Sequence, residues 1–88
     1  PALDLAVVAA LLSSYHDIPV SKDFCFAAEI GLSGEIRPIA KADLRIQEAE
    51  KLGLKGIAIS TYSKLAKTTK GIQIHSFSKV ESLIEFLF

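Results

Sequence analysis

The stretch EIGLSGEIRPIAKADLRIQEAEKLGLKG, residues 29–56, decides the fold of this 88-residue chain. It joins the end of an apolar strand, a turn containing Gly34, a short returning strand at 36–39 and an amphipathic helix at 41–52. Gly34 has no Cβ and can take the positive φ that a tight turn requires. Pro38 has no N–H to donate, so we expect the short strand to lie at a sheet edge or to end there.

The helix expected at 41–52 is amphipathic. Its apolar stripe consists of Ala42, Ile46, Ala49 and Leu52. The charged side chains of this segment lie largely away from that stripe, as in a helix that packs one face on a core. Gly53 follows the last apolar residue and suits the left-handed position after a helix end.

Outward from this segment, the pattern predicts further strands and a helix at each end. Residues 24–31 form a mostly continuous apolar run, which is typical of an interior strand. Near the C-terminus, Ser78 and Glu81 have the spacing of a capping box. The other expected elements are a helix at 1–15, strands at 56–60 and 71–75, a helical turn at 62–66 and a helix at 79–88. The order of elements predicts one small α/β domain with a right-handed crossover if the strands flanking the second helix are parallel.

The amino-acid composition and the net charge exclude some classes of protein. Half of the residues are hydrophobic, which excludes intrinsic disorder, and the formal net charge is zero, which gives no overall attraction to nucleic acid or anionic membranes. The run 3–12 is too short to span a bilayer. Cys25 has no cysteine partner, which favours a reducing, cytoplasmic location. Cys25, His16 and His75 lack ligand-like spacing, so no metal site is expected.

The motif GLSGEIRPI at 31–39 and the helix that follows it resemble the C-terminal part of the Lon-protease-like domain. The version that it resembles most is that of the RadA (Sms) family of bacterial DNA-repair proteins. The opening PALDLAVVAALLSS, residues 1–14, resembles the helix after the nucleophile loop of the same domain. The resemblance implies a two-layer α/β fold of the Lon-protease-like (ribosomal protein S5 domain 2-like) type. It covers only the C-terminal portion of such a domain, so we expect residues 1–88 to be a single domain fragment of a longer protein.

Lon-type peptidases use a serine and an unprotonated lysine held in an apolar site. The resemblance maps the serine position to Ala2 and the lysine position to Asp43, and neither side chain can perform those roles. Lys41 lies two positions earlier and faces a different side of the helix. The resemblance therefore implies a fragment without catalytic residues. Two rival hypotheses remain: an active Ser-Lys peptidase whose residues align differently, and a plain protein-interaction domain.

The resemblance also implies what the parent protein does. It would be a DNA-dependent ATPase in recombination and repair, with ATP and Mg²⁺ bound by an upstream domain and Zn²⁺ by an upstream cysteine motif. This chain itself contains no phosphate-loop motif and no CxxC. The expected role of the chain is a scaffold in a ring-like homo-oligomer that contacts single-stranded or branched DNA, with no membrane partner and no cofactor of its own.

Four basic residues around the strand-to-helix corner are the candidates for nucleic-acid binding: Arg37, Lys41, Arg45 and Lys55. Lysine and arginine side chains are the usual partners of backbone phosphates. The alternative is a solvated helix face whose charges are balanced by Glu48 and Glu50. A second basic run, Lys64, Lys67 and Lys70, is interpreted as ordinary solvent-exposed surface.

The remaining candidate side chains have structural interpretations. His75 is expected to be a packed strand residue, because no nucleophile lies nearby in sequence. Cys25 lies between Phe24 and Phe26 without a cationic neighbour, which favours a core residue over a reactive thiol. The helical stripe predicts that Phe86 packs on the sheet of its own domain rather than on another subunit.

Overall fold

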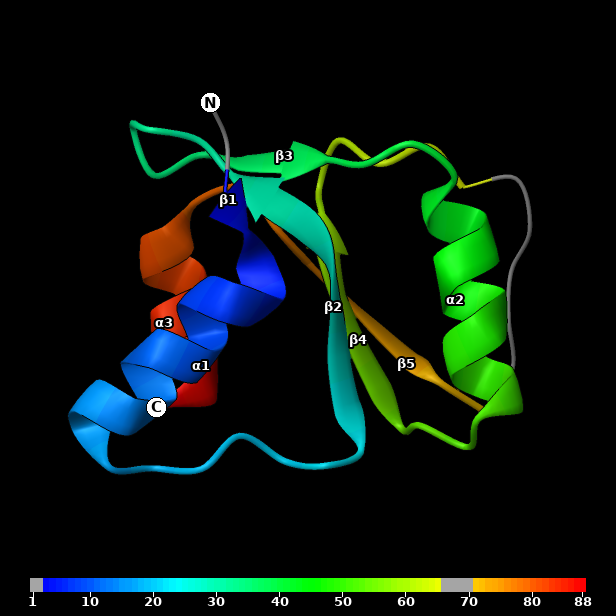
Figure 1. The fold of residues 1–88 in the computed structure, drawn as a ribbon. Helices are drawn as coiled ribbons and strands as arrows, with labels where there is room; N and C mark the ends of the chain where they lie inside the picture. The colour runs from blue at the N-terminus through cyan, green and yellow to red at the C-terminus, as the bar shows by residue number, and fades with distance from the viewer. Residues whose placement is uncertain (1–2, 66–70) are drawn as a thin grey trace.

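The computed structural model describes residues 3–65 and 71–88. Within these ranges, five strands form one mixed sheet, and helices lie on both sides of it (Figure 1). The elements in chain order are β1 (Leu3–Asp4), α1 (Leu5–His16), β2 (Phe24–Ile30), β3 (Ile36–Pro38), α2 (Ala42–Lys51), β4 (Gly56–Ser60), β5 (Gln73–Phe77) and α3 (Val80–Leu87). The predicted strands at 24–31, 36–39 and 56–60 and the helix at 41–52 are therefore confirmed to within one residue at each end. The strand predicted at 71–75 lies two residues later.

Strand β2 pairs with three of the other strands, β1, β3 and β4. Its first half pairs in parallel with β4, and β4 pairs in parallel with β5. Its second half pairs antiparallel with both β1 and β3, so that Ile30 lies opposite Leu3 on one side and Ile36 on the other. The chain therefore runs from β2 through β3 and α2 before it enters the parallel strand β4, as the order of predicted elements implied.

The helices make three layers rather than the two that the sequence analysis predicted. Helices α1 and α3 cover one face of the sheet and α2 covers the other (Figure 1). The reason lies in β2 and β4, which are apolar on both faces. Ala28 and Ala58 belong to the core cluster under α1 and α3, whereas Ala27, Ile57 and Ile59 belong to the cluster under α2. Strands buried on both faces need helices on both sides.

Helix α1 begins at Leu5, so the prediction of a helix from residue 1 was wrong. Asp4 is the N-cap, with extended backbone angles, and its Oδ1 accepts a hydrogen bond from the Ala6 N–H at 2.8 Å. The residues just before the helix pair with β2 instead. A capping aspartate and a sheet partner for the preceding backbone together fix this start.

The turn at 31–34 is hydrogen-bonded to the start of α3. Gly34 has a φ of 82°, as its position in the turn predicted, and its carbonyl accepts a hydrogen bond from Val80 N–H at 2.9 Å. The Ile36 N–H donates to the Ser78 carbonyl at 2.9 Å. The predicted capping box was wrong: the N-cap is Lys79, and no side chain caps it. The backbone of the turn supplies the acceptor that a Ser78 cap would have offered.

The segment after β4 corrects another prediction. Residues 61–65 are not helical, and Ala66, the end of the predicted helical turn, lies outside the described residues. The Tyr62 N–H donates instead to Ser60 Oγ at 3.1 Å, while that hydroxyl donates to the Ile36 carbonyl at 2.9 Å. Ser60 thereby ties the end of β4 to β3.

Replacing Ser60 with alanine is expected to lower the free energy of unfolding by about 1–3 kcal/mol, because it leaves a buried carbonyl without its donor. Urea denaturation measures the difference. Ser63→Ala is the matched control, because the buried Ser63 Oγ has no hydrogen-bond partner among the described residues. Removing that hydroxyl should leave stability unchanged or slightly raised. Equal losses in both variants would contradict the role assigned to Ser60.

Candidate functional site

A basic pocket lies where β3 and β4 end. It has a volume of about 370 Å³ and is lined by Pro38, Ile39, Ala40, Lys41, Tyr62 and Lys64. Pro38 is the last residue of β3, the next three residues belong to the connection from β3 to α2, and the other two belong to the segment that follows β4. Two lysines and a tyrosine therefore share one pocket, and no aspartate or glutamate is among its described lining residues.

The start of α2 contributes to this pocket. Lys41 is the N-cap, with left-handed backbone angles of φ 59° and ψ 39°, and its side chain makes no capping hydrogen bond. The N–H groups of the first helical turn point outward along the axis, where a helix carries partial positive charge. Asp43 lies in the same turn and is partly buried.

The other three predicted nucleic-acid residues lie elsewhere, each near a carboxylate. Arg37 Nη2 is 3.6 Å from Glu35 Oε1. Arg45 lines a pocket of about 200 Å³ that also contains Asp4 and Glu29. Lys55 lines a third pocket, near the amino ends of β2 and β4, together with Asp23. Lys41 thus shares a pocket with Lys64, and the pockets that Arg45 and Lys55 line are different ones. Nucleic-acid contact by the four residues stays a prediction.

The partner of Lys41 is a residue that the sequence analysis assigned to ordinary surface. Lys64 and Tyr62 follow a buried strand and are separated from α2 by the whole of that strand, so the spacing gave no sign of their proximity. Lys67 and Lys70 of the same run lie outside the described residues. The proximity follows from the sheet topology, because β3 and β4 both pair with β2 in adjoining registers: Pro38 lies opposite Ala28 and Ile59 lies opposite Ala27.

The resemblance mapped the Lon catalytic pair to Ala2 and Asp43. Ala2 lies outside the described residues, and Asp43 is in the first turn of α2. Among residues 3–65 and 71–88, no three histidine, cysteine, aspartate or glutamate side chains are placed to hold a metal ion. None of the helices within those ranges has the length and apolar character to cross a bilayer.

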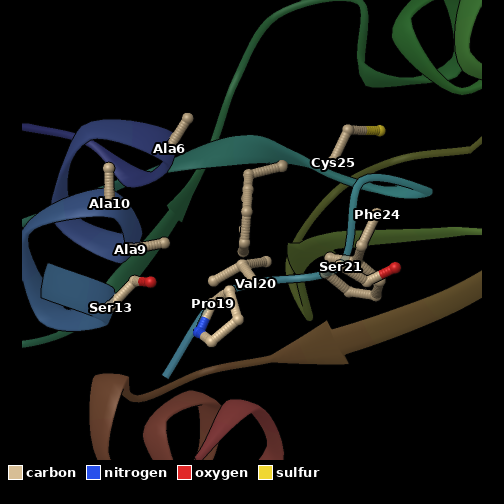
Figure 2. A pocket seen from close by; sticks show the side chains of 10 residues that line it. Ala6, Ala9, Ala10, Ser13, Pro19, Val20, Ser21, Phe24 and Cys25 are labelled. Atoms are coloured by element: carbon tan, nitrogen blue, oxygen red, sulfur yellow. The ribbon is translucent and has the colours of Figure 1, made fainter. Parts of the chain in front are cut away.

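Another pocket lies between α1 and β2 and is mainly apolar (Figure 2). Its volume is about 580 Å³. Small side chains of α1 line one wall, and the chain entering β2 forms the other, with Val20 and Phe24 among its residues (Figure 2). The lining residues are Ala6, Ala9, Ala10, Ser13, Pro19, Val20, Ser21, Phe24, Cys25 and Phe26.

Helix α1 also presents an apolar face to solvent. The helix is apolar nearly all round, and a helix of that kind is normally buried on several sides. The structure buries Leu5 and Ala9 on the sheet but leaves Val7, Leu11 and Tyr15 exposed by 56%, 66% and 83%. These three residues lie at i, i+4 and i+8, so they form one stripe along the helix.

The structural interpretations of three side chains agree with the structure. The His75 ring packs between aromatic rings, with its centroid 4.6 Å from that of Phe86 and 5.8 Å from that of Phe24. Phe86 also contacts Phe77, so it packs on its own sheet as predicted, although 46% of it stays exposed. Cys25 is half-buried and packs against the core cluster under α2.

Burial raises the pKa of the Cys25 thiol above its ordinary value, because the site disfavours the thiolate. The folded chain therefore keeps a proton that the unfolded chain loses above a pH of roughly 8.5, so the free energy of unfolding should fall as the pH rises through this range. Urea denaturation at neutral and alkaline pH measures the decline. We expect Cys25→Ala to show a shallower decline than the wild type. An identical pH dependence would contradict the assignment.

Comparison with known proteins places the chain in a family. A family model described as subunit ChlI of Mg-chelatase matches residues 1–63. The chain belongs to this ChlI family. Proteins named DNA repair protein RadA resemble the ChlI-family chain over its full length: that of Streptococcus pneumoniae is 39% identical over 89 residues and that of Aquifex aeolicus is 42% identical over 88 residues. The RadA of Listeria monocytogenes is 52% identical over 59 residues, which cover 67% of the chain.

The ChlI-family chain is short beside these relatives. It spans 21%, 19% and 13% of the length of the RadA proteins from Streptococcus pneumoniae, Aquifex aeolicus and Listeria monocytogenes, respectively. The similarity to RadA that the motif at 31–39 predicted is thereby supported for the chain itself. The match leaves about four-fifths of each RadA protein uncovered, so the functions of those parts are not inferred for this chain.

Proposed function

We propose that this chain is a non-catalytic scaffold and assembly segment of an ATP-dependent DNA recombination and repair protein of the RadA type, with a Lon-protease-like fold. The observation that carries the proposal is the 39% and 42% identity, over the entire chain, to two proteins named DNA repair protein RadA. The ChlI description names a magnesium-chelatase subunit, but its match ends at residue 63. Relatives that span all 88 residues are the better guide to function.

The proposal assigns two kinds of contact to the chain. One is contact with the DNA backbone through basic side chains, which neutralise phosphates and release counterions. The other is contact between copies of the protein. The ATPase activity, its Mg²⁺ and a zinc motif are assigned to other parts of the parent protein, because the sequence of this chain contains no motif for them.

The contact between copies is assigned to the exposed stripe of α1. No charged residue lies between Leu5 and Tyr15, so two such helices can face each other without like-charge repulsion. Ala6 and Ala10 are exposed and line the pocket between α1 and β2. Their small side chains allow a second helix to approach closely. A second copy of the chain is therefore the occupant that this surface suits.

The proposal excludes peptidase chemistry. A Ser-Lys peptidase needs a neutral amine beside a hydroxyl, and the corresponding positions hold Asp43 and Ala2. We expect no cleavage of casein by the full-length protein. Cleavage that disappears when Asp43 or Lys41 is changed to asparagine would favour the peptidase hypothesis instead.

A domain exchange tests the function directly. The segment of Streptococcus pneumoniae RadA that matches this chain is replaced by the 88 residues, and cells carrying the chimera are scored for survival after DNA damage. We expect survival well above that of cells carrying RadA with the segment deleted, because 39% identity over the whole segment preserves its surfaces. A chimera that is expressed and assembled but behaves like the deletion would overturn the proposal.

A further inference from the structure

We infer that the pocket between Lys41 and Lys64 binds a backbone phosphate of a nucleic-acid strand. The inference rests on the proposed function and names the surface and the chemical group for its DNA contact. It differs from the sequence-based prediction, which grouped Lys41 with Arg37, Arg45 and Lys55 and assigned Lys64 to unremarkable surface. The fold changes that grouping, because it places the loop after β4 beside the start of α2.

The first argument is the local charge. The other basic candidates each lie near an acidic side chain: Arg37 near Glu35, Arg45 in a pocket with Asp4 and Glu29, and Lys55 in a pocket with Asp23. The described lining of the Lys41 pocket includes two lysines and no acidic residue; Asp43, two positions after Lys41 in the first turn of α2, is not part of that lining. A chain with zero net charge attracts a phosphate only at such a local excess.

The second argument is the supply of hydrogen-bond donors. Each lysine ammonium group offers three donors, and the exposed Tyr62 contributes a hydroxyl. The N–H groups of Ala42 and Asp43 also lie at the start of α2, whereas that of Leu44 donates to the Lys41 carbonyl at 3.1 Å. Donors therefore come from two segments and from both side chains and backbone, which suits the several oxygens of a phosphodiester.

The third argument is the shape of the pocket. Pro38, Ile39 and Ala40 form an apolar part of the lining, next to the charged groups. A volume of about 370 Å³ holds more than a phosphate group, so the sugar attached to it also fits. Apolar surface beside a phosphate site suits a sugar-phosphate chain better than a free, fully hydrated anion.

The test is fluorescence anisotropy of a labelled oligo-dT strand titrated with the 88-residue chain at several salt concentrations. The variants are Lys41→Asn, Lys64→Gln and the double change; asparagine is chosen because it tolerates the left-handed backbone at residue 41. Each single change should weaken binding by about tenfold and reduce the slope of log affinity against log salt by about 0.7. Lys22→Gln, an exposed lysine in the connection between α1 and β2, is the charge-matched control and should bind like the wild type.

The outcomes separate this inference from the proposed function. If the wild type binds the strand but the Lys41 and Lys64 variants bind no worse than Lys22→Gln, the pocket assignment is overturned and DNA contact must lie elsewhere on the chain. If the wild type does not bind at all, DNA contact itself is rejected. The last measurement adds inorganic phosphate as a competitor of the labelled strand. If phosphate binds the pocket as tightly as the strand does, the pocket is a site for free anions, and the assignment is overturned. Thermal unfolding of each variant confirms that it is folded.

Discussion

Leu83→Ala is expected to remove about 2–5 kcal/mol from the free energy of unfolding. Leu83 is only 1% exposed and is the buried residue by which α3 anchors on the sheet. It belongs to the core cluster that also contains Leu5 and Ala58, so its removal leaves a cavity between two helices and the central strands. A domain of this size has roughly 0.05–0.15 kcal/mol of stability per residue, so the change removes a large share of the total.

Thermal unfolding followed by circular dichroism measures this effect. Each kcal/mol shifts the midpoint by about 4–8 °C in a domain of this length, so a fall of at least about 10 °C is expected. Leu52→Ala is the matched control, since Leu52 is 78% exposed at the end of α2 and should cost no more than about 0.5 kcal/mol. A midpoint for Leu83→Ala within a few degrees of that of Leu52→Ala would show that α3 is not anchored as described.

Periodicity and turn chemistry predicted the central elements because local forces determine them. The helix at 41–52 and its end at Gly53 follow from an apolar stripe and a residue that accepts a φ of 80°. The stripe was wrong only at Leu52, which is 78% exposed where the helix ends. The turn at Gly34 is similarly local. Each of these features depends on residues within a few positions of one another, which is the range over which sequence patterns are informative.

The errors arose where a partner distant in sequence decides the structure. Helix α1 starts at Leu5 because the residues before it pair with β2, some 25 positions later. The capping box at Ser78 is not used because the turn at Gly34 accepts the first N–H of α3. The third layer required knowing that β2 and β4 are neighbours whose alternate side chains bury opposite faces. None of these contacts has a local signature.

The candidate site was predictable only in part for the same reason. Lys41 was identified from its position at the strand-to-helix corner, and the structure places it in a pocket there. Lys64 was interpreted as plain surface, because its relation to Lys41 depends on the parallel crossover between β2 and β4. The sequence predicted the elements, whereas the order of strands in the sheet determined which basic side chains share a pocket.

Leu11→Lys is expected to weaken self-association of the chain by at least about a hundredfold. Leu11 is 66% exposed in the middle of the α1 stripe, between Val7 and Tyr15. Burying one leucine side chain contributes about 1.5–3 kcal/mol, and a symmetric contact between two copies loses that contribution twice. A charged ammonium group at the centre of the contact adds a desolvation cost.

Sedimentation velocity over a wide range of protein concentration measures this effect. The wild type should move from monomer to a larger species as concentration rises, and Leu11→Lys should remain monomeric. Leu52→Lys introduces the same charge at a leucine that is even more exposed, at 78%, and lies on the opposite side of the sheet, so it should associate like the wild type. A wild type that stays monomeric throughout, or a Leu52→Lys variant that dissociates as readily as Leu11→Lys, would reject the α1 stripe as a contact between copies. Because the α1 stripe and the Lys41 pocket are formed by different elements, Leu11→Lys should leave oligo-dT binding by the monomer unchanged.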